Sequence, residues 1–204
     1  MLKLVIFDDH RERREAIRLL ISLQDGMECI GDFEDCTDLV NNLTANPPDV
    51  VLMDVNMPGV TGIDGVKLLQ QYFPKTFIIM QTVFEDDENL FNCLVAGADD
   101  YLLKKVPNDR LINAIFDVVQ GIAHMTPEIA KHALTYFEKN HQPATEESSS
   151  LLENEQIVLA HLANGFSQKQ IALDFLTSEA VVQDTIKNIY RKLHSINEIA
   201  HKQT

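Results

Sequence analysis

The first 121 residues alternate short apolar runs with segments whose apolar side chains recur at helical spacing. Each of the five runs has the length of a buried strand, and a helical pattern follows each of them. Parallel strands need long and usually helical connections, so this alternation predicts a parallel sheet with helices on both faces. The expected strands are residues 2–7, 27–33, 50–53, 77–81 and 101–103, and the expected helices lie near 11–24, 36–45, 63–72, 86–96 and 108–120.

Polar side chains stand where four of the predicted strands end. They are Asp8 and Asp9 after the first strand, Asp54 after the third, Thr82 after the fourth and Lys104 after the fifth. Ligands of parallel α/β sheets bind beyond the carboxyl ends of the strands, so this fold brings these residues together. Crowded carboxylates repel one another until a proton or a cation relieves them, and Mg²⁺ prefers oxygen ligands. The pattern therefore predicts an acidic site that binds Mg²⁺.

Asp54 is the expected site of covalent chemistry. A carboxylate beside a bound metal can attack a phosphoryl group and become an aspartyl phosphate. Asp54 ends the central run and precedes a Pro58-Gly59 turn that leaves room for a phosphoryl donor. We expect the Asn56 backbone carbonyl to join the three aspartates around the metal, Lys104 to pair with the new phosphate and the Thr82 hydroxyl to donate to it.

Four motifs in this region resemble the receiver domain of bacterial two-component response regulators. They are Asp8-Asp9, residues 51–59, Thr82 and residues 97–104. The resemblance covers residues 1–121 and implies a doubly wound, flavodoxin-like sheet with the strand order 2-1-3-4-5. It also implies that a sensor histidine kinase supplies the phosphoryl group, that Thr82 moves toward the phosphate and that Tyr101 turns inward.

Two positions near the predicted site leave a choice. Lys104 rather than its neighbour Lys105 is the expected phosphate partner, because Lys104 directly follows the last apolar run. Phe84, two residues after Thr82, is a further candidate for the switch, and a partly buried loop aromatic is an equally good interpretation of it.

Residues 122–204 contain no predicted strand, unlike the first domain, and are expected to form helices on either side of a flexible stretch. A helix is expected from Thr126-Pro127 to about Lys139, because a capping residue followed by proline starts helices well. With the polar, flexible stretch 141–150 it forms a linker over residues 122–150. Residues 151–204 then form a small all-α domain with helices near 153–163, 168–175 and 178–193, and with a tail long enough for only a short further helix.

Segments 151–155 and 162–172 resemble the LuxR-type helix-turn-helix of the NarL/FixJ class of the same regulators, and the match continues at Val182, Ile186, Ile189 and residues 190–193. The resemblance implies that residues 178–193 form a recognition helix for the major groove of promoter DNA, and that a homodimer forms on phosphorylation. The residues expected to contact DNA are Lys169, Gln183, Lys187, Arg191 and Lys192.

The first turns of that recognition helix depart from the family pattern. Glu179 and Asp184 stand in a stretch where the family usually places basic and hydroxyl-bearing residues. Since phosphate neutralisation supplies most non-specific affinity for DNA, these anions weaken the DNA interpretation. Two hypotheses stay open: a phosphorylation-controlled, DNA-binding transcription regulator, and a phosphorylation-switched module whose helix-turn-helix binds protein rather than DNA.

The composition limits the class of protein further. The chain carries 31 Asp and Glu against 17 Lys and Arg, while residues 151–204 hold six against five, so the acidity lies mainly in the first 150 residues. It has no uncharged apolar stretch of the about 18 residues that cross a membrane, and its start lacks a signal-peptide pattern. Three cysteines without metal-ligand spacing favour a reduced, cytoplasmic protein. No second set of nucleophilic residues stands out, so we expect a regulator rather than an enzyme that acts on an external substrate.

Overall fold

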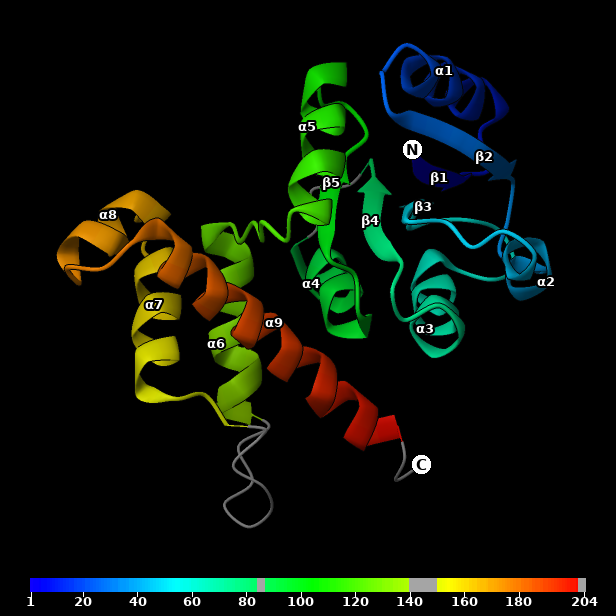
Figure 1. Ribbon diagram of the computed structural model, residues 1–204. Helices are drawn as coiled ribbons and strands as arrows, with labels where there is room; N and C mark the ends of the chain where they lie inside the picture. The colour runs from blue at the N-terminus through cyan, green and yellow to red at the C-terminus, as the bar shows by residue number, and fades with distance from the viewer. Residues whose placement is uncertain (84–86, 140–149, 202–204) are drawn as a thin grey trace. The chain divides into compact units, whose positions relative to one another are not determined.

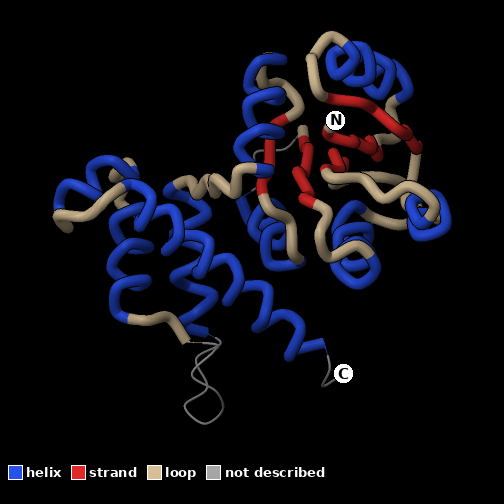
Figure 2. The backbone as a smooth tube through the Cα atoms, viewed as in Figure 1, coloured by secondary structure: helices blue, strands red, loops and turns tan. Residues whose placement is uncertain are grey.

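The structure, a computed structural model, describes residues 1–83, 87–139 and 150–201, and five strands lie in these segments where the sequence predicts them. They are β1 (Leu2–Phe7), β2 (Met27–Phe33), β3 (Val50–Asp54), β4 (Phe77–Thr82) and β5 (Asp100–Leu103). All of them pair in parallel, in the order β2-β1-β3-β4-β5 (Figure 1, Figure 2). The expected doubly wound sheet with the strand order 2-1-3-4-5 is confirmed.

Helices on both faces bury the sheet (Figure 1). One face carries α1 (Arg11–Ser22) and α5 (Asn108–Val119), and the other carries α2 (Leu39–Thr44) and α3 (Gly62–Tyr72). Leu4, Ile6 and Leu52 of the sheet are fully buried in one core with the apolar stripes of α1 and α5. Each such side chain contributes roughly 1.5–3 kcal/mol to folding. Because β3 lies between β1 and β4 and is buried at every position, the residue at its carboxyl end occupies the middle of the sheet edge.

A second compact unit contains five helices of the described segments. They are α4 (Asp87–Ala96), α6 (Pro127–Lys139), α7 (Glu153–Ala163), α8 (Gln168–Asp174) and α9 (Glu179–His201). α6 spans the residues predicted for the linker helix and packs along α7. The sequence order puts α4 in the predicted first domain, whereas its contacts group it with α6: the Phe91 ring lies 5.9 Å from the His132 ring and 5.5 Å from the Tyr136 ring. Residues 140–149, which hold nearly all of the predicted flexible stretch, lie outside the described residues.

α9 is longer than the sequence pattern predicts. The expected helix ends at Leu193 and a separate short helix follows, but the structure has one continuous helix from Glu179 to His201. No glycine or proline interrupts these residues, and Ser195 Oγ donates to the Arg191 carbonyl oxygen one turn earlier over 2.9 Å, so nothing in the chain stops the helix at Leu193. At 23 residues α9 has the length of a membrane span, but neither it nor any other helix of the described segments is apolar enough for one.

Asp99, just before β5, makes the stability of the sheet depend on pH. Its Oδ2 atom accepts the Ile78 N–H over 2.8 Å, and burial raises the pKa of Asp99 to about 7. The folded chain therefore keeps a proton that the unfolded chain releases near pH 4. Because the folded state binds more protons between these two pKa values, its stability falls as the pH rises through that window.

We expect Asp99→Asn to raise the free energy of unfolding more at pH 8 than at pH 5. The gain over the unchanged chain should be larger at pH 8 by roughly 1–3 kcal/mol. The asparagine amide oxygen can still accept the Ile78 N–H, but it carries no charge to desolvate. Urea unfolding followed by circular dichroism at the two pH values measures the difference. The exposed Asp25→Asn variant is the control and should show no such pH dependence. An effect of Asp99→Asn that is equal at both pH values would contradict this account.

Candidate functional site

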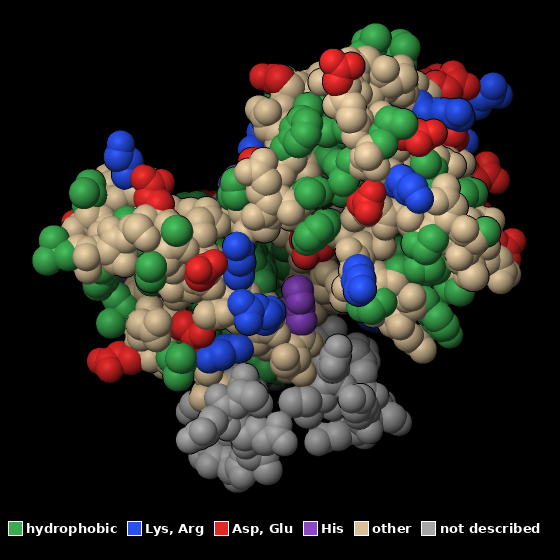
Figure 3. Space-filling model, in the orientation of Figure 1, with side chains coloured by type: hydrophobic (Ala, Val, Ile, Leu, Met, Phe, Trp, Pro, Cys, Tyr) green, Lys and Arg blue, Asp and Glu red, His purple; other side chains and the backbone are tan. Residues whose placement is uncertain are grey.

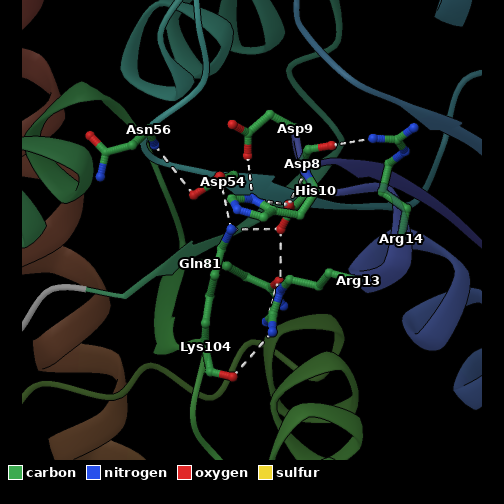
Figure 4. A network of polar contacts seen from close by, with 9 residues as sticks. All are labelled: Asp8, Asp9, His10, Arg13, Arg14, Asp54, Asn56, Gln81 and Lys104. Carbon is green, nitrogen blue, oxygen red and sulfur yellow. Dashed lines mark hydrogen bonds and ion pairs between the residues drawn. The ribbon is translucent and has the colours of Figure 1, made fainter.

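The carboxyl edge of the sheet brings together polar residues that are far apart in the chain (Figure 4). Lys104, which follows β5, places its Nζ atom 2.8 Å from Asp54 Oδ2 and 2.7 Å from Asp8 Oδ2. The sheet register explains the approach of the two carboxylates, because Phe7 of β1 pairs with Met53 of β3 and each aspartate is the next residue. One ammonium group therefore bridges two carboxylates at the middle of the sheet edge.

Burial sets the electrostatics of this edge. Asp8 is 1% exposed and Asp54 is 3% exposed. Burial raises the pKa of Asp54 above its ordinary value, and the hydrogen bond and charge of Lys104 oppose that rise. The Asp54 carboxylate is thus shielded from bulk water and held by a neighbouring cation, an arrangement that suits an oxygen nucleophile in a closed site.

The site has the ligands of a small divalent cation. Ligand atoms of Asp8, Asp9, His10 and Asp54 all lie within 4.8 Å of one another. Asp8 Oδ2 is buried and accepts no hydrogen bond, and a bound metal ion can satisfy such an oxygen atom. The three carboxylates therefore fit the oxygen preference of Mg²⁺. His10 is 69% exposed with its Nδ1 atom 2.6 Å from Asp9 Oδ1, so this ring contacts a carboxylate at the rim of the cluster.

The structure places three of the four other predicted receiver residues, Asn56, Thr82 and Tyr101, after β3, at the end of β4 and on β5. The Asn56 N–H donates to the carboxylate at the end of β3 over 3.3 Å, and its side chain points away from the cluster (Figure 4). Thr82 is buried at the end of β4, and its carbonyl oxygen accepts the Lys104 N–H over 2.7 Å. Tyr101 is partly buried on β5, and Phe84 lies outside the described residues.

Close backbone contacts hold the loop between β3 and α3. The Val55 N–H donates to the Gln81 carbonyl oxygen of β4, and the Gly62 N–H donates to the Val55 carbonyl oxygen over 3.1 Å. Thr61 caps α3 by accepting the Asp64 N–H on its hydroxyl oxygen. Gly62 is therefore the first residue of α3, and it lies close against the backbone of Asp54 and Val55.

Arg13 is a residue of the site that sequence reasoning missed. Its Nε atom lies 3.2 Å from Asp8 Oδ2, and its two terminal nitrogens donate to the Lys104 carbonyl oxygen and to Gln81 Oε1. The available signal was positional, because Arg13 lies four residues before the buried Ile17, on the stripe of α1 that faces the sheet. A charged residue in the first turn of α1, on the side that faces the sheet, points toward the carboxyl edge of the sheet.

The residues predicted to contact DNA fall into two groups in the second unit. Lys169 and Arg191 are exposed, and Lys187 is partly exposed with its Nζ atom 3.4 Å from Asp184 Oδ1. On the face drawn in Figure 3, this unit shows both basic and acidic side chains. Three of the five predicted residues are thus at least partly exposed, and one of them, Lys187, has an acidic neighbour.

Gln183 and Lys192, two of the residues predicted to contact DNA, make contacts inside the second unit. Lys192 Nζ lies 2.6 Å from Glu155 Oε2 and donates to the Ser150 carbonyl oxygen over 2.8 Å, with 16% of the side chain exposed. Gln183 accepts the Ala123 N–H over 3.0 Å and donates to the Gln168 side chain. Lys192 therefore joins α9 to α7, and Gln183 joins α9 to α8 and to the segment before α6.

Known proteins are similar to this chain in sequence and in architecture. The family model of the response regulator receiver domain matches residues 4–116, more than half of the chain. An uncharacterized transcriptional regulatory protein of Bacillus subtilis, YhcZ, is 34% identical over 192 residues, which cover 94% of this chain and 89% of YhcZ.

Solved structures of response regulators are similar to this chain in fold and, more distantly, in sequence. A LuxR-family response regulator from Aurantimonas sp. is 26% identical with a TM-score of 0.59, over 66% of this chain and 96% of that one. The two-component response regulator RcsB, solved in complex with DNA, is 25% identical with a TM-score of 0.58, over 95% of this chain and 92% of that one. The chain therefore belongs to the two-component response regulators, with a receiver domain followed by a helical region of the LuxR type.

Proposed function

We propose that this response regulator accepts a phosphoryl group from a sensor histidine kinase on Asp54, and that this modification controls transcription through the C-terminal helices. The observation that supports the acceptor assignment best is the buried Asp54 carboxylate, which lies 2.8 Å from Lys104 Nζ and clusters with Asp8 and Asp9. An Asp54 oxygen forms the new bond to phosphorus while the bond from phosphorus to the kinase histidine nitrogen breaks. The histidine nitrogen takes the leaving electron pair.

Asp8, Asp9 and Asp54, whose carboxylates lie together, would hold Mg²⁺. The Asn56 carbonyl oxygen, the fourth predicted ligand, would join them. When bound, Mg²⁺ neutralises charge on the phosphoryl oxygens. Lys104, which already contacts two carboxylates of the site, would pair with the new phosphate, and the Thr82 hydroxyl would donate to it.

The modification changes the charge of the site and thereby biases the nearby strands. A phosphate adds about −1.5 to −2 charge and three strong acceptors where one carboxylate stood. We expect Lys104 and Thr82 to move toward it and Tyr101 to turn inward. A complete switch from 1:99 to 99:1 needs about 5.5 kcal/mol of differential stabilisation, and a partial shift needs less.

For the C-terminal unit, binding of promoter DNA is the first candidate function. The similarity to RcsB, solved with DNA, and to a protein named as a transcriptional regulator supports it. Lys169, Lys187 and Arg191 are the cations that the structure leaves available for phosphates. We further propose that the regulator works in the cytoplasm and dimerises when phosphorylated; the three unpaired cysteines suit a reducing compartment.

Binding of a protein is the second candidate for this unit. Leu176, between α8 and α9, is 96% exposed, and the neighbouring Leu173 and Val181 are 66% and 52% exposed. Large apolar side chains exposed together mark interaction surfaces more often than surfaces for nucleic-acid phosphates.

Asp54→Asn is expected to abolish labelling by a small phosphodonor in the presence of Mg²⁺, because an amide oxygen cannot act as the nucleophile. Phosphate incorporation into the full chain measures it. Asp109→Asn, at an exposed position of α5, is the matched control and should label normally. Labelling of the Asp54 variant at the rate of the unchanged chain would overturn the acceptor assignment.

The same proteins test the C-terminal unit. The phosphorylated chain is expected to bind DNA with an affinity that falls linearly in the logarithm of salt concentration, and the Asp54 variant should bind more weakly under the same treatment. Absence of DNA binding by the phosphorylated chain even at low salt would leave the protein-binding candidate in its place.

A further inference from the structure

We propose that Arg13 competes with Mg²⁺ for the Asp8 carboxylate, so that this receiver binds Mg²⁺ more weakly than its three carboxylates alone would. The proposal rests on the proposed Mg²⁺ site and names a residue of this chain that sets the affinity of that site. It concerns metal binding before any phosphoryl transfer takes place.

Arg13 is fixed in the site from three directions. Its Nε atom lies 3.2 Å from Asp8 Oδ2, while its terminal nitrogens donate to the Lys104 carbonyl oxygen over 3.1 Å and to Gln81 Oε1 over 3.0 Å. These contacts join the ends of β1, β4 and β5 through one planar group (Figure 4). With 26% of the side chain exposed, the guanidinium cannot turn to solvent without losing two hydrogen bonds.

The Asp8 carboxylate already contacts two cations, with which a metal ion would have to compete. Its Oδ2 atom lies close to both Arg13 and the Lys104 ammonium, and its Oδ1 atom accepts the His10 N–H over 2.9 Å. The Oδ2 contact with Arg13 is an ion pair of 3.2 Å, and the contact of the same oxygen with Lys104 Nζ is 2.7 Å. Arg13, Lys104 and a bound metal ion would therefore compete for the same negative charge on Asp8.

Charge balance gives the direction of the effect. Three carboxylates and one lysine leave two negative charges, which match a divalent cation, whereas a second fixed cation leaves one. A guanidinium stays protonated at any physiological pH, so this charge is permanent. Bringing Mg²⁺ to the carboxylates then requires it to approach two positive groups in a partly buried site, where screening is weaker than in water.

The other arginines of α1 do not contact the carboxylates of the site, although Arg14 Nη1 donates to the Asp8 backbone carbonyl oxygen over 2.7 Å. Arg11 pairs with Glu15 in solvent, and Arg14 and Arg18 both pair with Asp32. Of the four arginines of α1, all of which the structure describes, Arg13 alone contacts a carboxylate of the predicted metal site. The effect is therefore a property of one position and not of the net charge of the helix.

Isothermal calorimetry of Mg²⁺ with the full, unphosphorylated chain tests the proposal. Arg13→Met, which keeps most of the side-chain length without the charge, is expected to lower the Kd for Mg²⁺ about tenfold. Arg11→Met is the matched control, because it removes the same charge from an 82% exposed position of the same helix, and its Kd should stay within about twofold of the unchanged chain. Arg13→Lys keeps a cation near Asp8 and should restore weak binding. Circular dichroism without Mg²⁺ verifies folding, and if Arg13→Met does not fold, Arg13→Gln is measured in its place with the same expectation.

An unchanged or higher Kd for the neutral Arg13 variant would overturn the proposal, as would equal tightening by Arg11→Met. So would the absence of measurable Mg²⁺ binding in all of these proteins. The outcome is separate from that of the labelling experiment, because no phosphodonor is present. If Asp54→Asn labels normally while Arg13→Met binds Mg²⁺ more tightly, the acceptor assignment fails and the role of Arg13 stands.

Discussion

Gly62→Ala is expected to destabilise the first unit by about 3 kcal/mol or more, which puts the change among the large effects of single substitutions. A Cβ atom at this position would lie 2.9 Å from the Asp54 carbonyl carbon and 3.0 Å from Val55 Cα, and closer still to the Asp54 carbonyl oxygen. These are backbone atoms at the end of the central strand, so they cannot move aside as the tip of a flexible side chain does. Helix propensity alone predicts the opposite sign, because alanine is better than glycine inside a helix by about 1 kcal/mol.

Urea unfolding, together with hydrogen exchange of the β3 amides, measures this loss of stability. Gly65→Ala on the same helix is the matched control, since its Cβ would meet the Cys36 and Met53 side chains, which can shift. We expect the control to cost about 1–3 kcal/mol and to cost less than Gly62→Ala. A Gly62 variant that is as stable as the unchanged chain would show that the backbone approach between β3 and α3 is looser than described.

Glu155→Ala is expected to destabilise the second unit by about 3–5 kcal/mol, the usual cost of breaking a buried ion pair from one side. Glu155 is 1% exposed, lies 2.6 Å from Lys192 Nζ and accepts the Leu152 N–H over 2.7 Å at the start of α7. Alanine leaves a poorly hydrated ammonium and an unpaired N–H group. The slowest-exchanging amides of α7 and α9 report the change by hydrogen exchange.

Asp184→Ala supplies the contrast on the same helix. Asp184 is 73% exposed and its contact with Lys187 is 3.4 Å long, so we expect its removal to cost at most about 0.5 kcal/mol. Adding Lys192→Met to Glu155→Ala removes the unpaired charge and should recover part of the lost stability. Equal effects of Glu155→Ala and Asp184→Ala would show that the Glu155–Lys192 pair is hydrated like a surface pair.

The arrangement of the acidic site follows from local patterns and chain connectivity. Each strand is a short apolar run, and parallel pairing places every carboxyl end at one edge, so Asp8, Asp54 and Lys104 had to approach although they are up to 96 positions apart. The same logic preferred Lys104 over Lys105, because the first residue after β5 is nearest that edge, and the structure places its Nζ atom 2.8 Å from Asp54. The spacing of apolar residues along the chain is a local property, so it could be read without a structure.

Which side chains pair with one another depends on residues far apart in the chain, and the sequence pattern did not predict these pairs. Arg13 and Lys192 look like ordinary surface cations on amphipathic helices, yet each is held against a buried carboxylate that comes from another element. The sequence pattern also gave no sign that Gln183, predicted to contact DNA from its place on α9, accepts a backbone N–H from the segment before α6. By itself the sequence determined the parallel sheet and the residues at its carboxyl edge, because hydrophobic periodicity and polar strand ends encode them, whereas the strand order was implied by the resemblance to receiver domains. Only the tertiary structure decided which charges are buried and with which partners, because desolvation and ion pairing depend on the elements that pack around a side chain rather than on its neighbours in the chain.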